Sequence, residues 1–169
     1  MIIRKAGAEG IVHALALLDG AAEWLVERGR PGQWGTEQQS TSPRRLAQSQ
    51  QWADSGGFYL AWIADEPVGA LVVGKAAAHI PPASEPELYV NLLVTDRRHA
   101  GEGIGAAMLD YARDLARAQG VRLLRLDCYA GDDRALVAYY EKQGFSATDT
   151  FSVEIRDTVW PGQVMELRL

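Results

Sequence analysis

The side chains with the clearest chemical potential lie in residues 88–109, which read LYVNLLVTDRRHAGEGIGAAML. An apolar stretch leads into a cationic segment, and alternating glycines then open an amphipathic helix: Arg97, Arg98 and His99, followed by Gly101, Gly103 and Gly105. Glycine lets a backbone approach an anion closely, and free N–H groups at a helix start point toward that anion. The helix dipole and a neighbouring arginine favour negative charge further. We therefore predict that this segment binds a pyrophosphate.

Three other interpretations of these glycines have to be weighed. The simplest is a glycine-rich turn before an ordinary surface helix, since glycine spacing alone is a weak signal. A P-loop requires Gly-Lys-Ser/Thr, and neither a lysine nor a hydroxyl residue follows Gly105 directly. The dinucleotide pattern G-x-G-x-x-G/A is met formally by Gly101, Gly103 and Ala106. However, residues 95–100 separate it from the strand end on which that motif sits.

A second motif follows after one helix and one strand. Residues 123–129 (LLRLDCY) read as a strand, and residues 135–145 (ALVAYYEKQGF) read as a short helix and its end. With both motifs in this order, the chain resembles the GNAT family of N-acetyltransferases. The family's Arg/Gln-x-x-Gly-x-Gly/Ala loop is matched by Arg98, Gly101 and Gly103. Its Tyr-Glu-x-x-Gly-Phe helix end is matched by Tyr140, Glu141, Gly144 and Phe145. The resemblance is close over residues 87–145 and holds elsewhere in outline.

The resemblance implies an α/β fold in which residues 1–169 form a single GNAT-like domain, with a mixed, splayed β-sheet flanked by helices. The fourth and fifth strands of such a sheet part, and the arm of an acyl-CoA, by default acetyl-CoA, enters the gap. The residues that the resemblance assigns to this cosubstrate are Leu92, Leu93, Val94, Arg98, His99, Ala100, Gly101, Glu102, Gly103, Ile104, Gly105, Asp133 and Tyr140.

Acyl transfer to a primary amine by direct attack in a ternary complex needs a neutral amine, a polarised carbonyl and a proton for the leaving thiolate. Backbone N–H groups at residues 92–94 would polarise the carbonyl. A phenol suits protonation of the thiolate, and the resemblance gives this general-acid role to Tyr140. Packing is the competing interpretation, because Leu136 and Tyr140 share one helix face.

The general base is less determined by the sequence. Glu87 begins the strand that lines the expected cleft, so we take it as the candidate, although an exposed strand-start residue fits equally well. Asp127 is a second candidate, or a hydrogen-bonded structural group within its strand. Many relatives carry Asn where this chain has Asp133, and a carboxylate accepts but does not donate a hydrogen bond. Asp133 or Asp132 would alternatively cap the next helix.

The acceptor pocket of such proteins is built by the first helices and the last strands, here residues 23–55 and 148–162. These segments hold several aromatic and acidic residues: Trp24, Trp34, Trp52, Phe151 and Trp160, with Glu23, Glu27, Glu37 and Asp54. An aromatic wall with carboxylates suits an organic cation, and a core of aromatics under an acidic surface fits equally. We expect a small-molecule amine. The alternative is a catalytically silent CoA-binding sensor or interaction module of the same fold.

Composition excludes several other classes. The 169 residues carry a net charge of −5, which argues against broad nucleic-acid binding. Cys128 stands alone and cannot form an internal disulfide, so we expect a reducing, cytoplasmic compartment. One cysteine and three scattered histidines predict no metal site. The first residues lack the long apolar run of a signal peptide, so we expect none, and we expect no membrane-spanning stretch. A homodimer is left open.

Hydrophobic periodicity and turn residues place the remaining elements. The first helix is expected over residues 9–27, either continuous or broken at Asp19-Gly20. We also expect a capped start of the second helix at Ser42-Pro43 and a turn around residues 160–162 between the last two strands. The predicted strands are residues 1–5, 58–64, 68–76, 87–94, 123–129, 145–155 and 164–169, and helices are expected from residues 9, 43, 104 and 135.

Overall fold

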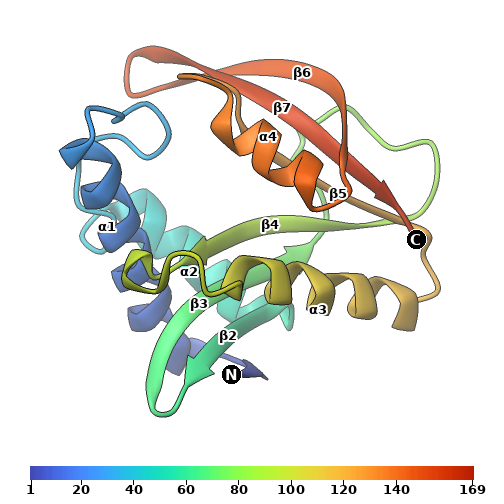
Figure 1. The fold of residues 1–169 in the computed structure, drawn as a ribbon, viewed down its shortest axis with the longest axis horizontal. Helices are drawn as coiled ribbons and strands as arrows, with labels where there is room; N and C mark the ends of the chain where they lie inside the picture. The colour runs from blue at the N-terminus through green and yellow to red at the C-terminus, as the bar shows by residue number, and fades with distance from the viewer. The chain divides into compact units, whose positions relative to one another are not determined.

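The computed structural model describes the whole chain, residues 1–169, and shows an α/β protein (Figure 1). Its strands are β1 (Ile2–Lys5), β2 (Phe58–Ile63), β3 (Glu66–Gly74), β4 (Glu87–Thr95), β5 (Leu123–Tyr129), β6 (Ser146–Ile155) and β7 (Thr158–Arg168). Its helices are α1 (Ile11–Glu27), α2 (Pro43–Ser55), α3 (Ile104–Ala118) and α4 (Ala135–Lys142), with short 3₁₀ turns η1 (Ala8–Gly10) and η2 (Arg97–His99).

The sheet has the strand order β1-β2-β3-β4-β5-β7-β6. β4 pairs in parallel with β5, whereas β1 with β2, β2 with β3, β5 with β7 and β6 with β7 pair antiparallel. The predicted mixed α/β fold is therefore confirmed. The chain divides into two compact units, residues 1–73 with 92–110 and residues 74–91 with 111–169. That the 169 residues act as one domain stays a prediction.

In the first unit, α1 and α2 pack on one face of the β1–β3 strands. Phe58 and Leu60 of β2 and Val72 of β3 meet Leu18 of α1 and Trp52 of α2 in one buried cluster. On the opposite face of β3, a Cβ built at Gly69 would lie 2.5 Å from Sδ of Met108 in α3. The missing side chain therefore lets the first half of α3 pack directly against the strand, which positions the start of that helix.

The first helix runs unbroken through Asp19-Gly20, so the predicted helix is confirmed in its continuous form. Buried residues on both sides of this pair, among them Leu18 and Ala21, hold the helix against the core, and Gly20 has open space around it. Asp19 is used instead to bind the loop after α1. One of its carboxylate oxygens accepts the N–H groups of Gln39 (2.5 Å) and Ser40 (3.2 Å).

The second helix begins and ends as its sequence predicts. The Ser42 hydroxyl accepts the N–H of Arg45, Pro43 occupies the first turn, and Gly56 closes the helix with φ +77°.

In the second unit, β4 and β5 pair in register from Glu87–Leu123 to Val90–Leu126. β5 then continues to Tyr129 and stays paired with β7 over its whole length. The ladder thus opens on the β4 side of β5 just before Asp127, which confirms the splayed sheet that the resemblance implies.

The last two strands form a long hairpin (Figure 1). Its turn lies at Arg156 and Asp157, between the paired residues Ile155 and Thr158, and not at residues 160–162 as predicted. Both turn residues have positive φ, +54° and +59°, as a two-residue hairpin turn requires. Trp160, Pro161 and Gly162 instead belong to β7, where they pair with Val153, Ser152 and Phe151.

Candidate active site

The predicted pyrophosphate loop follows β4 in the first unit and leads into α3. Gly101 and Gly103 have φ of +84° and +78°, and a Cβ built at either position would meet nothing within 4 Å. These glycines are therefore required by backbone conformation, and the space beside them is open to a ligand. At the start of α3, the N–H of Ala107 donates to the C=O of Gly103 (3.0 Å). The earlier N–H groups belong to the helix turn that has no acceptors of its own, which is the arrangement that binds phosphate.

The cationic part of this loop is already paired with acids. Arg98 is exposed, yet its guanidinium bonds both oxygens of Asp96 and also Glu66 at the start of β3. Asp96 additionally accepts the backbone N–H of Arg98 (2.9 Å), which shapes η2. The hydrogen bond from Arg98 is the main cause that lowers the pKa of Asp96. His99 contacts Glu102 at 2.6 Å. An incoming pyrophosphate would compete with these carboxylates for Arg98.

Glu66, Asp96 and His99 are close enough together for their ligand atoms to suit a cation. The Arg98 guanidinium already bonds the two carboxylates of this group, so a positive charge is in place there.

The end of β4 places its side chains on alternate faces. Leu92 and Val94 are buried in the core cluster of the first unit, while Leu93 is half-buried. Packing thus holds the backbone of residues 92–94 in a fixed position, as a preorganised donor to a carbonyl oxygen requires. The donor role itself stays a prediction.

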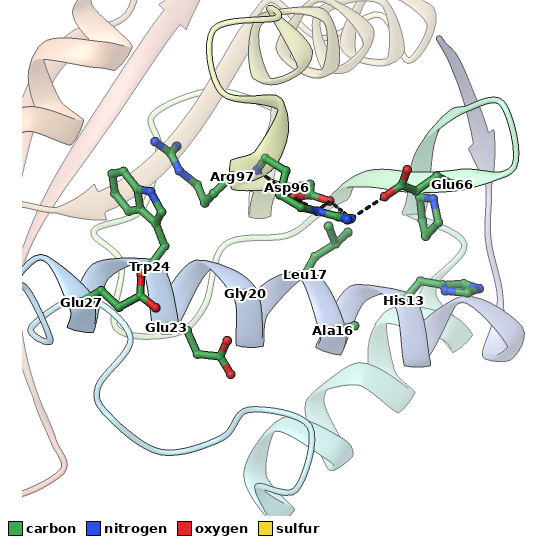
Figure 2. A pocket seen from close by; sticks show the side chains of 12 residues that line it. His13, Ala16, Leu17, Gly20, Glu23, Trp24, Glu27, Glu66, Asp96 and Arg97 are labelled. Atoms are coloured by element: carbon green, nitrogen blue, oxygen red, sulfur yellow. Dashed lines mark hydrogen bonds and ion pairs between the residues drawn. The ribbon is translucent and has the colours of Figure 1, made fainter.

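A groove of about 570 Å³ runs between α1 and the η2 turn in the first unit (Figure 2). Along α1 it is lined by Leu17, Gly20 and Glu23, and Arg97 reaches over it from η2. The guanidinium groups of Arg28 and Arg97 both lie over the Trp24 ring, each 3.9 Å from the ring centroid. The buried Nε of Arg97 has no hydrogen-bond partner, so the ring is its main stabilising contact.

These contacts bear on the aromatic acceptor wall expected from the sequence. Trp52 is buried in the core, Trp24 has two arginines over its ring, and Trp34 has Arg45 over its ring at 5.1 Å. These three tryptophans of the expected wall therefore stack with the protein's own arginines or fill the core. Phe151 and Trp160 belong to the second unit, where they form a separate row of aromatic side chains.

Tyr140, the predicted general acid, is buried on α4 in the second unit. Its ring packs edge-on against Tyr139 (5.1 Å) and Phe145 (6.0 Å), so the packing interpretation is correct for the ring. Its hydroxyl makes no hydrogen bond to another group of the protein. Burial raises the pKa of Tyr140, which keeps the phenol protonated and able to donate.

Asp133 has a structural contact of the kind expected for a cap. Its Oδ1 accepts the N–H of Ala135 (3.1 Å) at the start of α4. A contact with the pantetheine arm stays a prediction.

Glu87, the base candidate from sequence, is held by an arginine. Arg125 of β5 is 3% exposed, and its guanidinium bonds both Glu87 oxygens, one at 2.9 Å and one through Nε. The third arginine nitrogen donates to the carbonyl of Pro81 (2.9 Å). Arg125 thus occupies both Glu87 oxygens, and the pair fixes the start of β4 on β5. The base role of Glu87 stays a prediction.

A second carboxylate on the same face of the sheet has a different environment. Asp127 accepts the hydroxyl of Tyr89 at 2.5 Å, and burial raises the pKa of Asp127. Tyr89 was missed by sequence reasoning. The available signal was polar residues at alternate positions, Arg125 and Asp127, in an otherwise apolar strand.

In a mixed sheet, one pair of parallel strands, β4 and β5, ends after four residue pairs, and a glycine loop after β4 leads into a helix. This arrangement defines a GNAT-type fold. A model of the acetyltransferase (GNAT) family matches residues 18–145, which is more than half of the chain. The chain belongs to the GNAT family of acetyltransferases.

Relatives and solved structures agree with this assignment. Mycothiol acetyltransferase of Corynebacterium glutamicum is 32% identical over 134 residues, covering 78% of this chain and 43% of the relative. The uncharacterized N-acetyltransferase YesJ of Bacillus subtilis is 29% identical over 136 residues, covering 76% of this chain and 72% of the relative. A GCN5-related N-acetyltransferase from Rhodopseudomonas palustris aligns over 99% of this chain and 95% of its own, with a TM-score of 0.74 at 19% identity.

A ribosomal-protein-alanine N-acetyltransferase from Brucella melitensis aligns over 100% of both chains, with a TM-score of 0.71 at 20% identity. The present chain spans about two fifths of the length of the mycothiol acetyltransferases that it matches. None of the helices has the length and apolar character needed to cross a membrane.

Proposed function

We propose that this protein is an acyl-CoA-dependent N-acyltransferase that moves an acetyl group from acetyl-CoA to the primary amine of a small molecule. The amine attacks the thioester directly in a ternary complex. The observation that carries the proposal is the open glycine loop at the start of α3 in a chain of the GNAT family. The names of the mycothiol acetyltransferases support a small-molecule acceptor, although mycothiol chemistry itself is not assigned to this chain.

The loop of residues 98–105 holds the pyrophosphate of CoA in this proposal. Open space beside Gly101 and Gly103 admits the phosphates, and backbone N–H groups of the first turn of α3 donate to them. Arg98 adds one charge contact after it leaves Glu66 or Asp96. The loop thus supplies most of the binding through its backbone and a smaller part through a side chain.

Two further groups serve the chemical step in this proposal. Backbone N–H groups at residues 92–94 polarise the acyl carbonyl as charge develops on its oxygen. Tyr140 donates its proton to the departing thiolate, because its buried phenol is protonated at neutral pH and has no internal hydrogen-bond partner to give up.

The test combines binding with turnover. Purified protein is titrated calorimetrically with CoA, and acetyl-CoA is then incubated with a panel of primary amines while free thiol is measured. We expect saturable CoA binding and amine-dependent thiol release. Absence of both would overturn the proposal.

A second candidate function is a CoA-binding sensor or interaction module, and the pairing of two candidate CoA contacts within the protein favours it. Arg98 is bonded to acids, and Asp133 supports α4, so both candidate CoA contacts have structural partners. A CoA-binding sensor or interaction module would show CoA binding without thiol release over the same amine panel. We also propose a cytoplasmic location, because the single cysteine, Cys128, is a buried free thiol, as a reducing compartment allows.

A further inference from the structure

One face of the sheet in the second unit carries charged and aromatic side chains that the proposed steps do not use. Asp127 lies on this face with Tyr89, whose hydroxyl it accepts at 2.5 Å. Arg125 also lies there, and its guanidinium is 5.6 Å from the centre of the Tyr89 ring. Since Arg125 is bound to Glu87, that pair is charge-balanced, and Asp127 remains with a neutral phenol as its hydrogen-bond partner.

The position of Asp127 in the ladder is special. The pairing of β4 with β5 runs from Glu87–Leu123 to Val90–Leu126, so Asp127 is the first residue of β5 beyond the paired segment. Its only strand partner is Val164 of β7. Asp127 is half-buried, whereas its neighbours Leu126 and Cys128 are buried, so a ligand can approach its carboxylate.

Four aromatic rings form a row beside this carboxylate. His79 packs on Phe151 (5.3 Å), Phe151 on Trp160 (6.2 Å), and Trp160 on Tyr129 (5.5 Å between ring centres). Both ends of the row lie near Asp127. Tyr129 is the next side chain on the same face of β5, and His79 is close enough to lower the pKa of Asp127 by its charge.

The row is built into the backbone. A Cβ at Gly162 would lie 2.2 Å from the Phe151 ring, and a Cβ at Gly131 would lie 2.2 Å from the Tyr129 ring. The two rings therefore occupy space that any other residue at these positions would fill. This fit favours a specific flat surface over an accidental group of aromatics.

We propose that Asp127 binds the ammonium group of the acceptor and acts as the general base, and that the row His79, Phe151, Trp160 and Tyr129 holds the rest of that molecule. The inference rests on the proposed function and names its acceptor class, a primary amine carried on an aromatic or flat apolar group. Carboxylates attract ammonium ions, and aromatic faces favour both cations and flat apolar groups.

The proton balance is complete with the groups named. Asp127 takes one proton from the ammonium, and the amine lone pair then forms the C–N bond to the acyl carbon. The C–S bond breaks, and the thiolate receives the Tyr140 proton. The nitrogen loses a second proton, which restores Tyr140 through solvent, and Asp127 releases its own to solvent. The net products are an amide, free CoA thiol and one proton.

The first test is binding, which does not depend on turnover. The intact protein is titrated with 2-phenylethylamine, 2-phenylethanol and butylamine by NMR. We expect 2-phenylethylamine to bind tightest, and Asp127→Asn to weaken it on the order of 10-fold while leaving 2-phenylethanol unchanged. The matched control is Asp149→Asn, which removes an exposed carboxylate of β6. Equal binding of 2-phenylethylamine by wild type and Asp127→Asn, or no binding of it by either, would overturn the inference.

The second test is the pH profile of kcat/KM. The titratable groups that interact with Asp127 are Tyr89, His79, Cys128 and Tyr140. Burial raises the pKa of the Cys128 thiol to about 12, so this thiol does not contribute to the acidic limb, and the variant His79→Gln controls for the imidazole. A base must be deprotonated, and activity should fall as the pH drops through the pKa of Asp127. Tyr89→Phe removes a hydrogen bond that lowers this pKa, so the acidic limb should move to higher pH.

The variants separate the possible outcomes. Asp127→Asn should lower kcat by about 10²-fold or more and abolish the acidic limb, with CoA affinity unchanged. An acidic limb that disappears in His79→Gln and persists in Asp127→Asn would assign the base to His79 and overturn the inference. Normal turnover by Asp127→Asn would also overturn it, while the proposed function would stand. If wild type acetylates no amine, the proposed function fails, and the binding test alone decides the ammonium site.

Discussion

The Arg98 guanidinium is bonded to the carboxylate of Asp96, two residues earlier, with Nη2 at 2.6 Å from Oδ2. The same carboxylate accepts the backbone N–H of Arg98, so one acidic side chain both shapes the η2 turn and holds its arginine. Glu66 binds the guanidinium from the start of β3. The positive charge of Arg98 is thus paired with two acids, and in the proposed function CoA binding requires an exchange of carboxylate for phosphate.

Weakening this internal pairing should strengthen CoA binding. Glu66→Gln removes one competitor for Arg98 while Asp96 still shapes the turn, so we expect CoA affinity to rise about 2- to 5-fold at low salt. The effect should shrink as salt is added. Calorimetric titration measures both. Asp65→Asn removes the same charge one residue away and is the control; an equal gain there would show a general charge effect unrelated to Arg98.

The backbone of the loop should matter more than its arginine. Gly103→Val places a branched side chain at φ +78° and in the open space beside the first turn of α3, so CoA binding should fall by at least 10-fold. Gly120→Val is a matched control, because Gly120 has φ +73° and equally open surroundings at the end of α3. Both variants should lose similar stability, and only the first should lose CoA affinity. Arg98→Ala should weaken binding less than Gly103→Val.

The two arginines on Trp24 should be needed to position the η2 turn. Trp24→Leu removes the ring that both Arg28 and Arg97 contact, and the repulsion between the two guanidinium groups should then loosen the turn that precedes the glycine loop. We expect CoA affinity to fall about 5-fold, consistent with one or two cation–π contacts. Trp34→Leu removes a ring with a single arginine over it and should change affinity little. Equal losses would show that general destabilisation is responsible.

Local sequence patterns predicted much of the fold, and pairings across strands were beyond them. The Ser42 cap, the Gly56 stop and the glycine loop depend on neighbouring residues and are readable from the chain. The turn at residues 156–157 was missed because Arg and Asp adopt positive φ there, where glycine is the usual signal.

The pairs Glu87–Arg125 and Tyr89–Asp127 depend on the register of two parallel strands joined through a long helical connection. No spacing within either strand encodes that register. Once the register is known, the alternation of side chains along each strand places Arg125 and Asp127 on one face of β5, beside Glu87 and Tyr89 of β4. Arg125 then binds the Glu87 carboxylate, and Tyr89 donates to the Asp127 carboxylate.

Glu87 should therefore affect stability more than chemistry. Glu87→Gln leaves the buried Arg125 guanidinium without its charge partner, which should lower the free energy of unfolding by about 3 kcal/mol. Urea denaturation measures this loss, and Glu154→Gln on the exposed side of β6 should cost almost nothing. In the folded variant at low temperature, kcat should stay within a few-fold of wild type. A large loss of kcat with unchanged stability would return the base to Glu87.

Tyr140 should act through its hydroxyl alone. Tyr140→Phe keeps the ring that packs on Tyr139 and Phe145, and the hydroxyl makes no internal hydrogen bond, so folding and CoA affinity should survive. Loss of the proton donor should lower kcat on the order of 10²-fold where protonation of the thiolate limits the rate. Tyr139→Phe, on the neighbouring residue of the same helix, should remain close to wild type. With an acyl donor whose leaving thiol is more acidic than that of CoA, the thiolate needs less protonation. The difference in kcat between Tyr140→Phe and wild type should then be smaller. Normal turnover by Tyr140→Phe with acetyl-CoA would show that the tyrosine serves packing only.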